Sequence, residues 1–150
     1  MTDNMATQLE TALHAILPLV KTINVHIEEA RKGYVRVSMS RSPVVINHIN
    51  AFHAGALYTF AETVAAAAIT ASFDMSKIIV INKRGEINYR KLVTEKVESE
   101  ATFSEDEVNR ITEEVQTQGK SVFPYPVILK NPDGEVASEV TFDFYFKKPG

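Results

Sequence analysis

The chain has 150 residues, 45% of them apolar and 23% charged, which suits one globular domain with a buried core. Its 16 basic and 19 acidic residues give a formal net charge of -3, so it lacks the positive surface expected of a nucleic-acid-binding protein. The absence of cysteine excludes disulfides and thiolate catalysis, and the absence of a basic segment followed by a long apolar run at the N-terminus predicts a cytoplasmic protein.

The first part of the chain predicts one short helix followed by two strands. Leucine and isoleucine recur at helical spacing between Thr7 and Leu17, which indicates an amphipathic helix that ends near Pro18. Apolar residues then alternate with polar ones over 23–27 and again over 35–39, on either side of a turn at Lys32-Gly33. This alternation predicts two antiparallel strands joined by that turn.

The segment 54–73 predicts the helix around which the rest of the chain is organised. It carries one ionisable residue, Glu62, among alanines and other apolar or small residues. A helix of this length could span a membrane, but its alanine content and its central carboxylate favour burial inside a soluble fold. We therefore expect a sheet to enclose this helix on all sides, with no membrane partner. A carboxylate enclosed in this way has to be paired, protonated or used.

The second part of the chain predicts four strands and one inserted helix. Ser104 and Glu107 form a capping box at the start of a polar helix, and residues 131–134 form a hairpin turn of the Asn-Pro-Asp-Gly type. Gly85 marks a bulge or a close backbone approach. Since no repeat or linker interrupts the pattern, residues 1–150 are expected to form a single α+β domain. The expected strands begin at 78, 97, 121 and 136.

Three residues at the start of the central helix carry a resemblance to a known family. Asn47 is followed six positions on by His53, and Glu62 comes nine positions after that. This motif resembles the hotdog-fold superfamily, and more closely its acyl-CoA thioesterases of the phenylacetyl-CoA type. The order of elements fits along nearly the whole chain, and the inserted helix at 104–119 is similar to that of an uncharacterised, thioesterase-like branch. The resemblance implies a hotdog fold, with an antiparallel β-sheet wrapped around a long central α-helix.

The resemblance also implies roles for the catalytic candidates. Glu62 would serve as general base for water or as nucleophile on the thioester carbonyl, and Asn47 would orient the water or the substrate. The family shows His-Gly-Gly where this chain has His53-Ala54-Gly55, and a backbone N–H of Ala54 or Gly55 would form the oxyanion hole. The chemistry supports this independently, because a helix N-terminus leaves free donors with partial positive charge.

Alternative interpretations exist for two of these residues. Glu62 could be a structural carboxylate that is hydrogen-bonded by Thr59, Thr63 or a neighbouring chain. His53 is expected to hydrogen-bond the backbone of its own loop. A metal site at His48 and His53 would lack a clear third ligand, so no metal is expected.

Candidate substrate-binding residues are of three kinds. Asn82 falls where relatives place a small hydroxyl residue that faces the site. Basic residues near the mouth could contact the phosphates of coenzyme A or could simply be solvated, and aromatic residues of the central helix could line an acyl tunnel or belong to the core. The basic candidates are Lys83, Arg84, Arg90 and Lys91; the aromatic ones include Phe52, Tyr58, Phe60 and Phe73.

The resemblance further implies an assembly. In the family the site lies at a dimer interface, where the asparagine and the backbone donor of one subunit face the carboxylate of the other. We therefore expect a homodimer, or a dimer of dimers (a homotetramer), with residues 78–81 forming an edge strand that pairs across subunits. An interior strand is the alternative for this apolar run.

The function predicted from the sequence is an acyl-CoA thioesterase-like hydrolase. Coenzyme A is then part of the substrate, and no separate cofactor is expected. One alternative is a non-catalytic acyl or acyl-CoA binding protein on the same scaffold. Another is a dehydratase of 3-hydroxyacyl thioesters, in which His53 pairs with Glu62.

Overall fold

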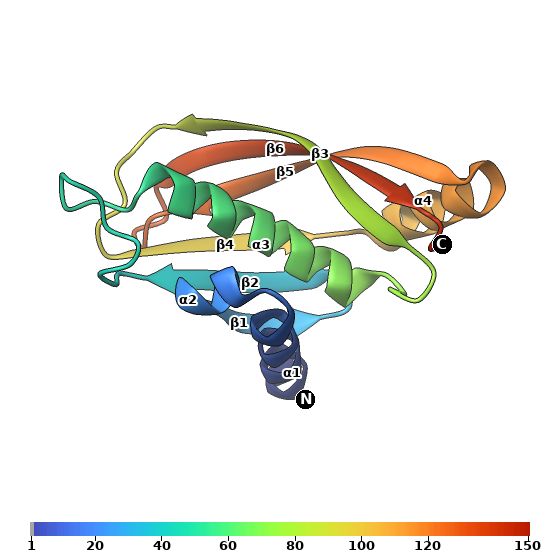
Figure 1. The fold of residues 1–150 in the computed structure, drawn as a ribbon, viewed down its shortest axis with the longest axis horizontal. Helices are drawn as coiled ribbons and strands as arrows, with labels where there is room; N and C mark the ends of the chain where they lie inside the picture. The colour runs from blue at the N-terminus through green and yellow to red at the C-terminus, as the bar shows by residue number, and fades with distance from the viewer. Residues whose placement is uncertain (1) are drawn as a thin grey trace.

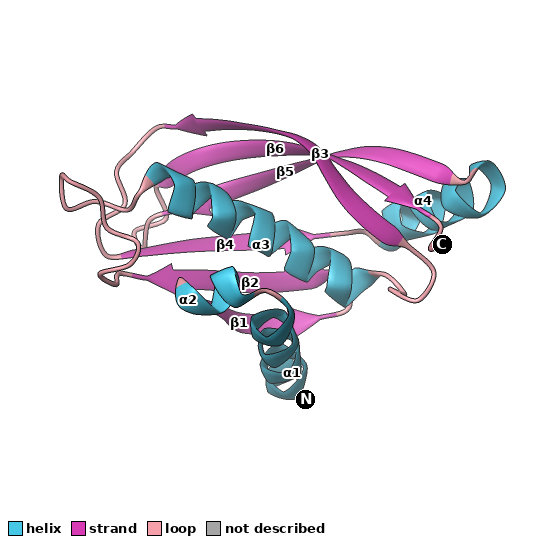
Figure 2. Cartoon of the chain, in the orientation of Figure 1, coloured by secondary structure: helices cyan, strands magenta, loops and turns pink. Residues whose placement is uncertain are grey.

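A six-stranded antiparallel sheet curves around one long helix, α3 (Ala54–Ser72), in the computed structural model, which describes the backbone of residues 2–150 and side chains from residue 4 (Figure 1). The strands lie in the order β1-β2-β4-β5-β6-β3. This α+β architecture is the predicted one. The strands are β1 (Val25–Arg31), β2 (Tyr34–Ser40), β3 (Ile79–Tyr89), β4 (Lys96–Thr102), β5 (Lys120–Lys130) and β6 (Val136–Lys147), and the other helices are α1 (Thr2–Ile16), α2 (Pro18–Thr22) and α4 (Glu105–Gln118) (Figure 2).

Local signals in the sequence set most element boundaries. The Ser104 hydroxyl accepts a hydrogen bond from the Glu107 N–H (3.1 Å), and the Glu107 carboxylate accepts one from the Ser104 N–H (2.9 Å), which confirms the capping box of α4. Gly33 (φ 83°) lies in the turn between β1 and β2, where its positive φ suits glycine. α1 ends before Pro18 as expected. The short helix α2, which Pro18 begins, was not predicted from the sequence.

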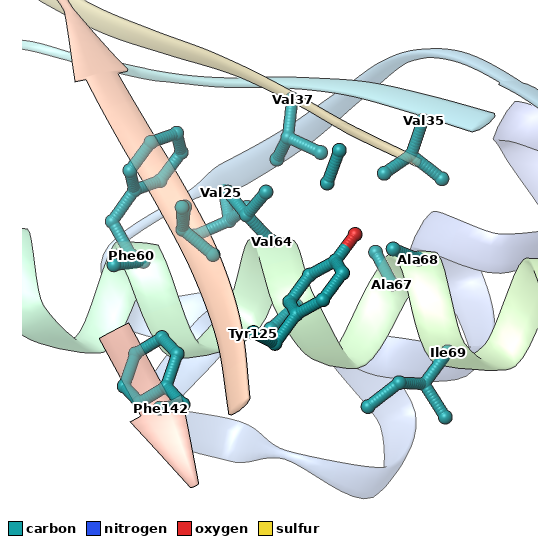
Figure 3. Packing of buried hydrophobic residues seen from close by; sticks show 14 of the residues in the cluster. Val25, Val35, Val37, Phe60, Val64, Ala67, Ala68, Ile69, Tyr125 and Phe142 are labelled. Carbon is teal, nitrogen blue, oxygen red and sulfur yellow. The ribbon is translucent and has the colours of Figure 1, made fainter. Parts of the chain in front are cut away.

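The core lies between α3 and the inner face of the sheet. Phe60, Val64 and Ala68 of α3 have no exposed surface, and they pack among inward-facing residues of the strands such as Val37 (Figure 3). The small residues of α3 allow this close approach. By length and composition alone α3 could cross a membrane, but eleven of its 19 residues are buried in the fold.

One face of α3 remains uncovered. Gly55, Glu62 and Thr70 are exposed. The prediction that α3 is enclosed on every side, with Glu62 inside, is therefore wrong for a single chain. The physical reason is that the sheet curls around only part of the helix circumference. Apart from Glu62, the open face carries small residues and threonines instead of charged ones, so the sequence alone does not distinguish it from the buried face.

The sheet is split between β4 and β5. β5 pairs with β6 along its whole length but with β4 at a single residue pair. Pro124 and Pro126 have no backbone N–H to donate. Because the pairing of β5 with β6 is intact at both prolines, the donors that they lack are on the side of β5 that faces β4. The Ser99 hydroxyl closes part of the gap by donating to the Ile128 carbonyl (2.7 Å).

The two edges of the sheet differ in their protection. α1 lies against β1, where the Glu10 carboxylate accepts from the Ile27 N–H (2.8 Å) and His14 Nε2 donates to the Val25 carbonyl (2.7 Å). Over residues 2–150, no helix or side chain hydrogen-bonds the outer backbone edge of β3 in this way. The prediction that residues 78–81 begin an edge strand is thus confirmed, and the alternative of an interior strand is wrong. β3 is the edge that stays open for pairing.

Candidate active site

The first turn of α3 leaves the N–H groups of Ala54 and Ala56 without an acceptor among residues 2–150. His53 is the N-cap residue, and its Nδ1 accepts a hydrogen bond from the Gly55 N–H (2.9 Å). The His53 N–H itself donates to the Val45 carbonyl (2.7 Å). The Ala54 N–H has no acceptor among residues 2–150. Of the two predicted oxyanion donors, Gly55 is therefore occupied by the cap and Ala54 is available.

Asn47 organises the loop that leads into α3. Its Oδ1 accepts hydrogen bonds from the Ile49 N–H (3.0 Å) and the Ala51 N–H (3.1 Å), and its own N–H donates to the Ala51 carbonyl (2.8 Å). Asn50 adopts a positive φ of 61° and is a turn residue. Since Oδ1 of Asn47 is occupied, the group it can offer to a ligand is the amide NH₂, for which the described part of the chain supplies no partner.

Glu62 is held by Asn82 of the neighbouring strand β3. Asn82 Nδ2 donates to Glu62 Oε2 at 2.7 Å. The threonines that could have satisfied Glu62 bond elsewhere, because the hydroxyls of Thr59 and Thr63 donate to backbone carbonyls four residues earlier in α3. Asn82 Oδ1 is buried and finds no donor in the described chain. The pair thus offers an exposed carboxylate, whereas the carbonyl oxygen of Asn82 beside it is closed off from solvent.

A β-bulge in β3 makes this pairing possible. Asn82 pairs with Phe144 and Arg84 with Asp143, so Lys83 is an extra residue in the ladder. Successive side chains of a strand point to opposite faces, and the extra residue allows both Asn82 and Gly85 to face α3. The sequence had suggested a bulge or a close approach at Gly85. The bulge lies just before this glycine, and a Cβ at Gly85 would lie 2.0 Å from the Tyr58 hydroxyl oxygen.

Tyr89, at the end of β3, was not recognised from the sequence. Its hydroxyl donates to the Ala54 carbonyl at 2.8 Å. Burial raises the pKa of Tyr89, with a smaller contribution from Tyr58, so the phenol remains a donor at neutral pH. The peptide group between Ala54 and Gly55 is therefore fixed at both ends. Tyr89 bonds its carbonyl, and His53 bonds its N–H. No signal in the sequence predicts this contact, because a separation of seven residues from Asn82 would place the two side chains on opposite faces of a strand without the bulge.

One chain does not bring the carboxylate and the free donor together. Ala54 and Glu62 are eight residues apart on α3, which places their backbones about 12 Å apart along the helix axis. Helical N–H groups point toward the N-terminus, so an acceptor at Ala54 would lie still farther from Glu62. His53 is one residue more distant, and its Nδ1 is occupied. The pair of His53 with Glu62 that the dehydratase alternative requires is not formed within the chain.

The four basic candidates near β3 all have partners. Each partner is an acidic or aromatic side chain on β3 or on the β5–β6 hairpin. Exposed ion pairs of this kind are weak and can exchange partners with a ligand phosphate. Lys83 lies over the Tyr145 ring (4.7 Å), Arg84 is 3.5 Å from Glu86, Arg90 is 2.8 Å from Glu139, and Lys91 is 3.3 Å from Glu135.

The remaining candidates differ in exposure. Phe52 is buried, at 3% exposure, whereas Tyr58 is half-buried on the same side of α3 as Glu62 and contacts the Phe142 ring edge to face. Phe60 and Phe73 belong to the core. In the described part of the chain, no three histidine or acidic side chains are grouped as metal ligands.

A family comparison identifies the chain. The model of a domain of unknown function, DUF4442, matches residues 6–146. The chain belongs to this family. No curated protein matches the chain at a significant level.

Solved structures similar to this DUF4442 chain are thioesterase-like hotdog proteins. The Pseudomonas aeruginosa protein PA5026, of unknown function and described as a probable thioesterase, is 26% identical with a TM-score of 0.88, covering 95% of this chain and 96% of its own. The Escherichia coli PaaI protein of the phenylacetic acid degradation operon is 15% identical (TM-score 0.69, covering 100% and 97%). A mutant of the P. aeruginosa thioesterase PA1618 is 14% identical (TM-score 0.74, covering 96% and 94%). These similarities confirm the predicted hotdog fold.

Proposed function

We propose that this DUF4442 protein is an acyl-CoA thioesterase. The observation that carries the proposal is that one chain presents both an exposed carboxylate held by an amide and a free backbone donor at the N-terminus of α3. Thioester hydrolysis requires these two groups, one to activate water and one to stabilise the oxyanion. The similarity to PA5026 along almost the whole chain supports the same class of reaction.

In the proposed mechanism, Glu62 takes a proton from a water molecule as the water attacks the thioester carbonyl carbon. Asn82 Nδ2 holds the carboxylate in place by donating to its Oε2. The Ala54 N–H donates to the carbonyl oxygen as negative charge develops on it. Collapse of the tetrahedral intermediate breaks the C–S bond, and the proton held by Glu62 neutralises the departing thiolate.

We infer that each site combines groups from two copies of the chain. The distance along α3 separates Glu62 from Ala54 in one chain, whereas two α3 helices running antiparallel would bring the Ala54 of one copy to the Glu62 of the other. The open edge of β3 is positioned for this association. Ile79 and Ile81, each 40% exposed on this strand, add apolar surface that pairing would bury.

The geometry favours hydrolysis over dehydration. A dehydratase of this fold would require His53 to act on the substrate together with a carboxylate. Here His53 Nδ1 accepts the Gly55 N–H and serves as the helix cap, which occupies one ring nitrogen in a structural role. The water-activating pair of Glu62 and Asn82 has no such competing role.

The experiment that tests the proposal is hydrolysis of short, long and aromatic acyl-CoAs by the wild-type protein and by Glu62→Gln. Both proteins are first checked for equal folding and association. We expect turnover by the wild type and a rate at least about 100-fold lower in the variant, since general acid–base catalysis contributes roughly 10²–10⁴-fold. If neither protein turns over any substrate while acyl-CoA raises the melting temperature of the wild type, the chain is a binding protein instead.

A further inference from the structure

Tyr58 of α3 carries a hydroxyl group that the chemistry described above does not use. Tyr58 lies four positions before Glu62, so the two side chains share one face of the helix and are about 6 Å apart along its axis. The hydroxyls of Tyr89 and Tyr125 each donate to a backbone carbonyl, whereas that of Tyr58 has no partner in the described part of the chain. Tyr58 thus places an unoccupied donor one helical turn from the candidate carboxylate.

A notch in β3 holds the Tyr58 hydroxyl in place. Gly85 forms this notch, because a Cβ at Gly85 would lie 2.0 Å from the hydroxyl oxygen. The Tyr58 ring packs edge to face against Phe142, with 5.7 Å between the ring centroids. Gly85 follows Asn82, the partner of Glu62, on the same strand, so the hydroxyl and the carboxylate both lie in the seam between α3 and β3. Packing therefore sets the position of this donor before any ligand binds.

The other hydroxyl groups near Glu62 on α3 are already engaged. Those of Thr59 and Thr63 donate to backbone carbonyls of the helix at 2.9 and 2.7 Å. One turn after Glu62, Ala66 offers only a methyl group. Among the described residues of α3 within one turn of Glu62, Tyr58 therefore carries the hydroxyl hydrogen that remains available to a ligand.

Two atoms of a thioester gain negative charge during hydrolysis. The carbonyl oxygen gains it when water attacks, and in the proposed mechanism the Ala54 N–H donates to this oxygen. The sulfur gains it when the C–S bond breaks and the bonding electron pair moves to sulfur, before the proton on Glu62 reaches it. A thioester sulfur is a weak hydrogen-bond acceptor, whereas a thiolate forms a stronger, charge-assisted bond. A donor at the sulfur therefore stabilises the transition state more than the bound substrate.

We propose that the Tyr58 hydroxyl donates a hydrogen bond to the sulfur of the leaving thiol and is a further catalytic residue beside Glu62. The bond strengthens as the C–S bond breaks. Tyr58 keeps its proton throughout, and the proton that converts the thiolate into the free thiol comes from Glu62. This inference rests on the proposed thioesterase function and adds the group that assists departure of the leaving thiol.

The kinetic experiment compares two thioesters of the same acyl group that differ in the leaving thiol. One is the acyl-CoA, and the other is the ester of an aryl thiol, whose thiolate spreads its charge into the ring and requires less stabilisation. We expect Tyr58→Phe to lower kcat/KM about 10–100-fold for the acyl-CoA, the usual effect of a hydrogen bond to a charged group, and less than about threefold for the aryl thioester. Tyr34→Phe, which removes a hydroxyl bonded to Glu100 on the far face of the sheet, should change neither value.

A structural role for Tyr58 would give a different kinetic result. A misplaced helix or strand slows both thioesters alike, so an equal loss with the two substrates overturns the hydrogen bond to sulfur and leaves the thioesterase intact. Absence of any loss overturns it as well. Tyr58→Phe retains the ring that contacts Phe142, and circular dichroism verifies that the variant is folded.

A binding experiment decides the role of Tyr58 even if the protein hydrolyses no thioester. Calorimetry at pH 9 compares CoA, whose thiol is then partly ionised, with desulfo-CoA, in which hydrogen replaces the thiol. We expect Tyr58→Phe to weaken binding of CoA at least about threefold and to leave binding of desulfo-CoA unchanged. Equal weakening of both ligands, or of neither, contradicts the hydrogen bond to sulfur. Absence of hydrolysis with every substrate overturns the proposed function separately.

Discussion

Replacing Gly85 with alanine tests how closely β3 packs against α3 beside the candidate site. A Cβ at this position would lie 2.0 Å from the Tyr58 hydroxyl oxygen, 2.8 Å from its Cζ and 3.0 Å from its Cε2. The φ of Gly85 is not positive, so crowding is the only source of strain. The Tyr58 ring also packs edge to face against Phe142, so a movement away from Gly85 would disturb this contact. We expect Gly85→Ala to lower the free energy of unfolding by about 1–3 kcal/mol, the usual cost of overpacking.

A double-mutant cycle with Tyr58→Phe assigns this cost to the contact. Removing the hydroxyl eliminates the 2.0 Å approach but leaves the two ring carbons close, so the rescue should be partial. The penalty of Gly85→Ala should shrink by at least about 0.5 kcal/mol in the Tyr58→Phe background. Urea unfolding gives the free energies, and each kcal/mol corresponds to about 2–4 °C in melting temperature for a domain of this size. A penalty below about 0.5 kcal/mol, or one that Tyr58→Phe leaves unchanged, would refute the packing described.

Three further predictions concern the site and the sheet. Asn82→Ala should lower kcat at least about tenfold with little change in KM, because it releases the Glu62 carboxylate that we propose as the general base; an equal rise in KM would indicate a binding role instead. Tyr89→Phe should lower kcat by several-fold at an unchanged pH profile and with a stability loss of about 1 kcal/mol or less, since it removes the hydrogen bond that holds the Ala54 carbonyl. The hydrogen bond from Ser38 lowers the pKa of Glu28 from its ordinary value of 4.5, so this stabilisation is present above pH 4.5 and is lost as pH falls through the lowered pKa of the folded state. Urea unfolding between pH 3 and 7 should therefore show a smaller pH dependence for Ser38→Ala.

Much of the fold could be predicted because its signals are local. The capping box at Ser104, the turn before Gly134 and the alternation of β1 and β2 each depend on a few neighbouring residues. The position of residues 78–81 at a sheet edge also followed from the resemblance. The exposure of Glu62 could not be predicted, because the pattern of small residues on α3 does not say how far a sheet curls around it.

The candidate site was predicted as a set of residues rather than as a geometry. Asn82 was expected to face the site, but its bond to Glu62 depends on the extra residue Lys83 in β3, and an insertion of this kind has no clear signature in one sequence. The choice between Ala54 and Gly55 as free donor depends on the ring orientation of His53. These features arise from tertiary contacts between segments that are distant in the chain.

The shared site can be tested with two inactive variants that complement each other. Ala54→Pro removes the free N–H at the first position of α3, where proline is tolerated, and the extended backbone of His53 (φ -61°, ψ 135°) suits a residue that precedes proline. Glu62→Gln removes the carboxylate. Each variant alone should be inactive against a substrate that the wild type hydrolyses.

The decisive measurement is the activity of an equal mixture of the two variants after they are refolded together. If each site takes Ala54 from one copy and Glu62 from the other, half of the dimers contain one intact site of two, and about a quarter of the wild-type activity returns. If both groups act within one chain, every site in the mixture carries a lesion. Absence of recovered activity in verified mixed dimers would contradict the shared active site.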